Sequence, residues 1–293
     1  MTRLVFVHGR AQEGKDPDAL CRLWVDALTE GLGVPTAPPA VAAAAMPFYG
    51  DTLAEWVTRE PPALVAYGGG DGQSREISAF AQELVLEMAT AYDLTDQAVA
   101  AELPAGALKA YGVKNWAWVQ AVLAALDRKV SFAGRGVLRF VADVEAYLQA
   151  PYVGEDIRQI VSEPLRQAAT DHEPVVVVAH SLGSVVAYEI LRDLVPTLDV
   201  PLFVTVGSAL GFATIQRHLR PPPLARPAGV THWLNVYDPR DPVSLRRPGA
   251  KIAGFPGVDD HLEVPNPHND AHGVAGYLSH PGVAARIGHE VDR

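Results

Sequence analysis

The segment VVVVAHSLGSVVAYEIL, residues 175–191, sets the strongest limit on how this chain can fold. Its four consecutive valines favour a β-strand covered on both faces, and the apolar residues after Gly183 favour a buried helix. A strand that passes so quickly into a helix needs small residues at the turn, and Ala179 and Gly183 lie on either side of Ser181. The segment therefore predicts a strand, a sharp turn with the Ser181 hydroxyl at the end of a sheet, and a helix. A serine that only caps the helix is the alternative.

Similar apolar runs predict further strands along the chain. They lie at residues 4–7, 41–46, 202–206, 233–237 and 261–264. Helical stretches separate most of them, at 18–30, 182–194 and 212–219. Strands that alternate with helices are typical of a mostly parallel sheet. We therefore expect an α/β fold with about six strands in a central sheet flanked by helices.

A long and mainly helical interruption separates the second predicted strand from the third. Its helical segments lie at 76–92, 95–102, 115–127, 137–148 and 154–169. In the last segment Ile157, Val161 and Leu165 recur at helical spacing, which favours packing against the sheet. The sequence thus predicts a core of residues 1–69 and 151–293 and a helical cap, or lid, inserted at 70–150.

Composition argues against several classes of function. The net charge of −10, without a lysine and arginine cluster to offset it, disfavours nucleic-acid binding. Cys21 is the only cysteine, so neither an internal disulfide nor a cysteine-based metal site is expected. The apolar runs are too short to span a bilayer, and strand-like residues from Leu4 leave no room for an export signal. We therefore expect a cytoplasmic chain without integral membrane association.

A serine in such a strand-to-helix turn is placed as a nucleophile is in a nucleophile elbow. To act as one, Ser181 needs a general base and an acid that orients the base, in the chain order Ser, Asp, His. The strand predicted at 233–237 is followed by two candidate acids, Asp238 and Asp241. Asp241 precedes Pro242 and Val243, whereas Asp238 directly follows the strand and could instead cap the turn. We favour Asp241 as the acid.

Three histidines follow the last predicted strand or lie within it. His272 directly precedes a helix-like stretch and is the favoured base, His268 in a proline-bounded turn is second, and His261 falls within the strand. The pair His268 and His272 also has the i, i+4 spacing of a zinc helix, but Asn269 replaces the glutamate that the motif requires. We expect no metal site.

The opening segment LVFVHGRAQEGKD has the glycine and lysine spacing of a nucleotide-binding P-loop. Asp16 occupies the position at which that motif has a hydroxyl, and Asp16 with Pro17 predicts a helix start. We therefore expect Lys15 to be an exposed flanking charge. Nucleotide hydrolysis that depends on Lys15 is the alternative hypothesis.

The chain resembles serine α/β-hydrolases of the lipase and esterase type. The resemblance rests on FVHG, PFYGD, DVEAYL, VVAHSLGSVVAYEIL, TVGSALGF, NVYDPRDPV and AHGVAGYL, and it covers nearly the whole core but not the cap. Ala179 replaces the first glycine of the G-x-S-x-G elbow, and Ala209 replaces a proline of related sequences. The resemblance implies an α/β-hydrolase fold that lacks its first two strands. It also implies hydrolysis of a small-molecule ester or lipid through an acyl-enzyme, without a cofactor.

The resemblance also suggests roles for the opening loop. The backbone N–H of Arg10, or of Gly9, would join that of Leu182 in an oxyanion hole. The remaining residues near the nucleophile become candidate substrate-binding residues, namely His8, Gly9, Gln12 and His180. A thioesterase or lipid-acyl hydrolase of the same fold and a non-catalytic binding protein are the alternatives.

Overall fold

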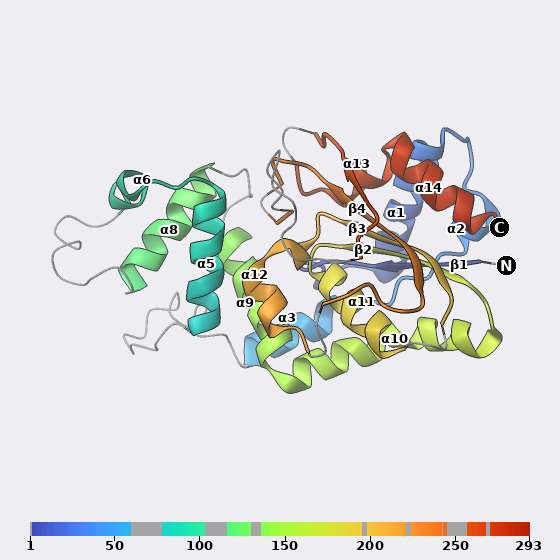
Figure 1. Ribbon diagram of the computed structural model, residues 1–293, viewed down its shortest axis with the longest axis horizontal. Helices are drawn as coiled ribbons and strands as arrows, with labels where there is room; N and C mark the ends of the chain where they lie inside the picture. Colours follow the sequence, from blue (N-terminus) through green and yellow to red (C-terminus); the bar gives the residue numbers. More distant parts are fainter. Residues whose placement is uncertain are drawn as a thin grey trace.

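The computed structural model describes most of the chain. The described residues are 2–59, 78–102, 116–129, 136–194, 198–220, 224–241, 243–244, 257–267 and 270–293. Within them the chain forms an α/β architecture with one open, all-parallel sheet flanked by helices (Figure 1). No helix in this described part is long and apolar enough to cross a membrane.

The sheet has five described strands in sequential order. They are β1 (Arg3–Val7), β2 (Val175–His180), β3 (Val200–Val206), β4 (Val230–Tyr237) and β5 (Asp260–Glu263). The valines of β2 alternate between the two faces: Val175 and Val177 join one hydrophobic cluster, and Val176 and Val178 join the other. Burial on both faces explains why the run is continuously apolar.

The prediction of a strand at residues 41–46 is wrong. Residues Pro39–Ala42 form the short helix α2, and Ala45 makes only an isolated bridge with Val5 at the outer edge of β1. The segment consists largely of alanines, which favour helix, and Pro39 suits the first turn of a helix. The described sheet therefore has five strands instead of the expected six.

Helices cover both faces of the sheet. On one face lie α1 (Pro17–Leu32), α13 (Val274–Leu278) and α14 (Pro281–Val291), and on the other lie α10 (Pro151–Asp171) and α11 (Leu182–Asp193) (Figure 1). The Asp16 side chain accepts a hydrogen bond from the Asp18 N–H at the start of α1, so the predicted helix start is confirmed. Lys15 is exposed and contacts Gln12, as expected of a flanking charge.

The insertion between α3 (Gly50–Arg59) and α10 is helical where it is described. Helices α5 (Ala79–Ala91), α6 (Asp96–Ala100) and α8 (Trp116–Lys129) lie to one side of the sheet (Figure 1). Helix α9 (Gly136–Gln149) contacts α5 and α8 and also α3 and α10. It therefore joins the inserted helices to the core, and most of its buried hydrophobic residues belong to the same cluster as Val175 and Val177 of β2. The predicted boundary at 69 and 70 lies outside the described residues.

Gly183 in the first turn of α11 offers a test of this packing. A Cβ at this position would meet the backbone carbonyl oxygens of Val7 and His8, closer than real Cβ atoms approach. We expect Gly183→Ala to lower the free energy of unfolding by about 1–3 kcal/mol, because neither backbone atom can move aside. Urea unfolding of wild type and variant measures the loss.

Gly288→Ala in α14 is the matched control. Its added Cβ would meet only the end of the flexible Leu32 side chain, so the loss should stay below about 1 kcal/mol. Equal losses for the two variants would contradict the tight contact between α11 and the end of β1.

Candidate active site

Ser181 occupies a strained turn between β2 and α11. Its backbone has φ 55° and ψ −127°, a combination that costs a non-glycine residue about 1–3 kcal/mol. Its N–H donates to the Val206 carbonyl at 3.2 Å, and its carbonyl accepts from the Ser184 N–H and Oγ. The Ser181 side chain caps no N–H of the helix, so the helix-capping alternative is wrong. Some other use must account for the strain.

The loop after β1 lies directly against this turn. A Cβ on Gly9 would stand 2.8 Å from the Ser181 Cβ, so only glycine allows this approach. Among the described residues, the main-chain N–H groups of Arg10 and Leu182 form no hydrogen bond. Two unused donors therefore lie on the segments that flank the Ser181 side chain. Such donors can stabilise an anionic oxygen.

An aspartate and a histidine form the second part of the site. The His272 Nδ1 lies 2.9 Å from both carboxylate oxygens of Asp241, which is 1% exposed. Asp241 also accepts from the Val243 N–H at 2.9 Å and from the Tyr277 hydroxyl at 2.6 Å. Burial by itself would raise the pKa of Asp241, but His272, the Tyr277 hydroxyl and the Val243 N–H bring it below the ordinary value. Asp241 is therefore a carboxylate that orients His272.

Gly207 joins the two parts of the site at the end of β3. Its φ is +53°, and a Cβ there would lie 2.8 Å from the Asp241 Oδ2 and 3.1 Å from the His272 Nδ1. The carbonyl of the preceding residue, Val206, accepts a hydrogen bond from the Ser181 N–H. Ser181 and the Asp241–His272 pair thus flank one strand end. Ser181 is 1% exposed, and its Oγ has no hydrogen-bond partner among the described residues.

Asp238 is also buried but has a different environment. It accepts from the backbone and guanidinium of Arg240 and, at 2.8 Å, from the Asn266 N–H. Burial would raise the pKa of Asp238, but these donors lower it below the ordinary value. Asn266 in turn donates to the carbonyls of Ala271 and Gly273, on either side of His272. Asp238 therefore anchors the loop that carries His272.

His8 holds the opening loop from within. It is 0% exposed and stacks on Tyr49 at 4.1 Å between ring centroids, and burial lowers its pKa to about 4. In this neutral state its Nδ1–H donates to the Gly9 carbonyl at 2.7 Å and its Nε2 accepts from the Tyr49 N–H at 3.1 Å. His8 thus joins its own loop to Tyr49, with both ring nitrogens engaged and no exposed surface.

The side chains of His180 and Gln12, which were predicted to bind substrate, form hydrogen bonds with other residues of the protein. The His180 Nε2–H donates to the His272 carbonyl at 2.8 Å, and the two rings lie 4.5 Å apart. Burial lowers the pKa of His180 to about 3, so the ring is neutral. Gln12 donates to the Arg10 carbonyl at 2.8 Å and accepts from Lys15. Each side chain thus supports a segment of the site.

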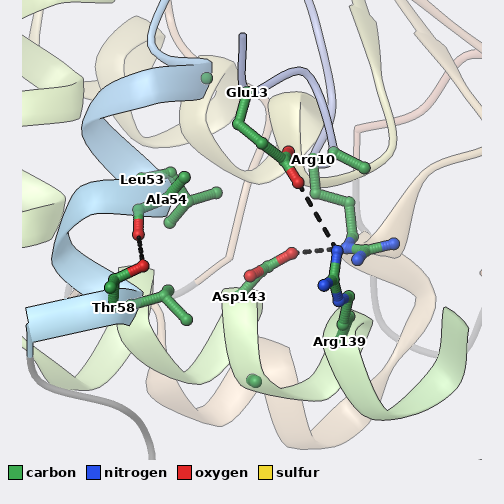
Figure 2. Close-up of a pocket in the computed structure, with 11 residues that line it drawn as sticks. Arg10, Glu13, Leu53, Ala54, Thr58, Arg139 and Asp143 are labelled. Carbon is green, nitrogen blue, oxygen red and sulfur yellow. Dashed lines mark hydrogen bonds and ion pairs between the residues drawn. The ribbon is translucent and has the colours of Figure 1, made fainter. Parts of the chain in front are cut away.

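The Arg10 side chain extends from the loop to α9, where its Nε donates to the Asp143 Oδ2 at 2.6 Å (Figure 2). The two side chains are 12% and 15% exposed. They line one end of a cavity of about 440 Å³ between the loop, α3 and α9, and Leu53 and Ala54 line the opposite wall (Figure 2). The guanidinium of Arg10 is thus paired with Asp143 at this cavity.

The other candidate residues lie elsewhere. His261 is on β5 and contacts the Asn235 side chain at 3.4 Å, and His268 lies outside the described residues. No group of three or more potential metal ligands occurs in the described part of the chain. Four contributors escaped the sequence analysis: Tyr277, Asn266, Asp143 and Gly207. Of these, Tyr277 lies within AHGVAGYL, Asp143 begins DVEAYL and Gly207 lies within TVGSALGF, so three of the four belong to segments that carry the resemblance.

Comparisons of the chain with models of known protein families, with curated proteins and with solved structures gave no match.

The anchoring role of Asp238 predicts a pH-dependent loss of stability. Since its pKa in the folded chain lies below the ordinary value of 3.8, its ionised form stabilises the fold above about pH 4. That contribution disappears as the pH falls through the lowered pKa. We expect Asp238→Asn to lower the free energy of unfolding by about 1–3 kcal/mol at pH 7, and by less at pH 3. Urea unfolding at both pH values measures this difference.

The control is Glu55→Gln, which removes an exposed ion pair on α3 and should change stability by less than about 1 kcal/mol. An Asp238→Asn variant as stable as wild type at pH 7 would contradict the anchoring role.

Proposed function

We propose that the chain is a serine hydrolase that cleaves carboxylic esters through an acyl-enzyme. One observation carries the proposal: a buried serine in a strained turn and His272, paired with the buried carboxylate of Asp241, flank the same strand end. Strain at a position that caps no helix is typical of functional sites. Chain order also agrees, because the acid follows β4 and the histidine follows β5.

In the proposed mechanism Ser181 is the nucleophile, His272 transfers protons, and two backbone N–H groups stabilise the oxyanion. His272 donates its Nδ1–H to Asp241, which leaves Nε2 free of a proton and able to take the proton of the Ser181 hydroxyl. The Ser181 Oγ then attacks the ester carbonyl carbon, and the developing oxyanion accepts hydrogen bonds from the N–H groups of Arg10 and Leu182. His272 returns the proton to the departing alkoxide. Water, deprotonated by the same imidazole, then attacks the acyl carbon. The Ser181 Oγ departs and takes this proton from His272, which releases the carboxylic acid and restores Ser181.

We infer that the fold is of the α/β-hydrolase type. The parallel sheet, the turn between β2 and α11 and the placement of Asp241 and His272 after later strands support this assignment. The substrate is a small-molecule ester or lipid, and thioesters would react by the same steps. The proposal requires neither a cofactor nor nucleic acid.

A non-catalytic binding protein of the same architecture is the second candidate. The observation that favours it is the Ser181 Oγ, which makes no hydrogen bond among the described residues and so none to a described histidine. A hydrolase would form the bond between Ser181 and His272 when substrate binds, since catalytic hydrogen bonds are often long in free enzymes. Covalent chemistry distinguishes the two candidates.

The proposal predicts that a fluorophosphonate labels Ser181. Peptide mass spectrometry should locate the adduct on the peptide that contains this serine, and Ser181→Ala should abolish it. Asp241→Asn should slow labelling by about 100-fold or more, because the imidazole loses its orienting carboxylate. Asp260→Asn, which breaks an exposed ion pair with Arg286, should label at the wild-type rate.

Two results would contradict the assignment. Wild type that stays unlabelled would favour the binding protein over the hydrolase. If Asp238→Asn were labelled more slowly than Asp241→Asn, Asp238 and not Asp241 would be the acid that orients the catalytic histidine.

A further inference from the structure

We infer that Asp143 is a positioning residue for the oxyanion hole: it holds the guanidinium of Arg10 and thereby orients the Gly9–Arg10 peptide against Ser181. The inference rests on the proposed function. It assigns a role to DVEAYL, a segment of helix α9. The proposed mechanism with Ser181, His272 and Asp241 gives this segment no role.

The orientation of the Gly9–Arg10 peptide determines whether the Arg10 N–H can reach a substrate oxygen, because the peptide is planar. The Gly9 carbonyl and the Arg10 N–H belong to the same planar trans peptide, so they point in opposite directions. The His8 Nδ1–H holds the carbonyl at 2.7 Å. The Arg10 N–H on the other side forms no hydrogen bond among the described residues, which leaves it available to a substrate oxygen.

A second restraint is needed because His8 holds only one end of this unit. Ala11, the residue after Arg10, has φ 58°, a left-handed conformation that costs a residue with a Cβ free energy. Contacts on Arg10 must therefore oppose relaxation of the loop. Within the described part of the chain, Gln12 donates to the Arg10 carbonyl at 2.8 Å, and the Arg10 Nε donates to the Asp143 Oδ2 at 2.6 Å.

Of these two contacts, the one with Asp143 connects the loop to the body of the protein. Gln12 belongs to the loop itself, whereas Asp143 lies 133 residues away on α9. The pair is largely shielded from water, and charge-assisted bonds of this kind are stronger than neutral ones. The neighbouring pair of Arg139 and Glu13 is longer, at 3.6 Å, and more exposed (Figure 2). Asp143 is therefore the main tether between the loop and α9.

Kinetics on the p-nitrophenyl ester that wild type cleaves fastest test this role. Asp143→Asn should lower kcat about 10- to 100-fold and change KM less than about threefold, because the oxyanion forms only in the transition state. Asp260→Asn is the control, since it removes a carboxylate from another arginine pair remote from the loop, and it should keep the wild-type kcat. Thermal unfolding of each variant checks that the fold is intact.

The cavity beside the pair permits a second measurement. Asp143→Ala leaves space that opens into the cavity of about 440 Å³, through which formate can reach Arg10. We expect formate, but not chloride at equal ionic strength, to raise the kcat of Asp143→Ala at least threefold and to leave Asp260→Asn unchanged. A purely structural loss would not respond to formate.

Hydrogen exchange of the peptide over residues 8–16 supplies a readout that does not require activity. It should exchange faster in Asp143→Asn than in wild type. Unchanged exchange, a wild-type kcat in Asp143→Asn, or the absence of formate rescue would each overturn the inference while wild type still reacts with a fluorophosphonate. A wild type that does not react would overturn the proposed function and this inference with it.

Discussion

The positive φ of Ser181 is the constraint on which the site depends. Holding this residue in its turn costs about 1–3 kcal/mol. The cost is offset by main-chain bonds to Val206 and Ser184 and by the close approach of Gly9 and Gly183 to their neighbours. The bond to Val206 and the close approaches of Gly9 and Gly183 require β1, β2 and β3 to end at the same level. The sheet thus determines where the serine lies.

Buried carboxylates organise the second half of the site in the same way. A carboxylate removed from water is stable only when donors satisfy it. Asp241 has His272, Tyr277 and the Val243 N–H, and Asp238 has Arg240 and the Asn266 N–H. Because two buried acids share one loop region, the loop carrying His272 is anchored at its backbone by one and at its imidazole by the other.

Sequence patterns predicted the elements that local chemistry determines. The valines at 175–178 and the Asp16–Pro17 helix start were identified correctly, since β-branching, burial and capping are encoded within a few residues. The strand expected at 41–46 was wrong because an alanine run has little strand preference. The structure pairs His272 with Asp241, as preferred from the Pro242–Val243 that follows.

Contacts between distant segments were beyond the reach of such patterns. Nothing near Asp143 indicates that it meets Arg10, and nothing near Gly207 indicates that a side chain there would strike Asp241. His8 and His180 were expected to contact substrate because they flank the site in sequence. In the fold their nitrogens bond to Gly9, Tyr49 and His272. These roles follow from tertiary packing, which no short window of sequence contains.

A crystal structure of the protein after reaction with diethyl p-nitrophenyl phosphate tests the central claim most directly. The account predicts a covalent bond from the Ser181 Oγ to phosphorus. It also predicts a phosphoryl oxygen about 2.7–3.1 Å from the backbone nitrogens of Arg10 and Leu182. An unmodified Ser181, or a phosphoryl oxygen directed away from both nitrogens, would contradict it.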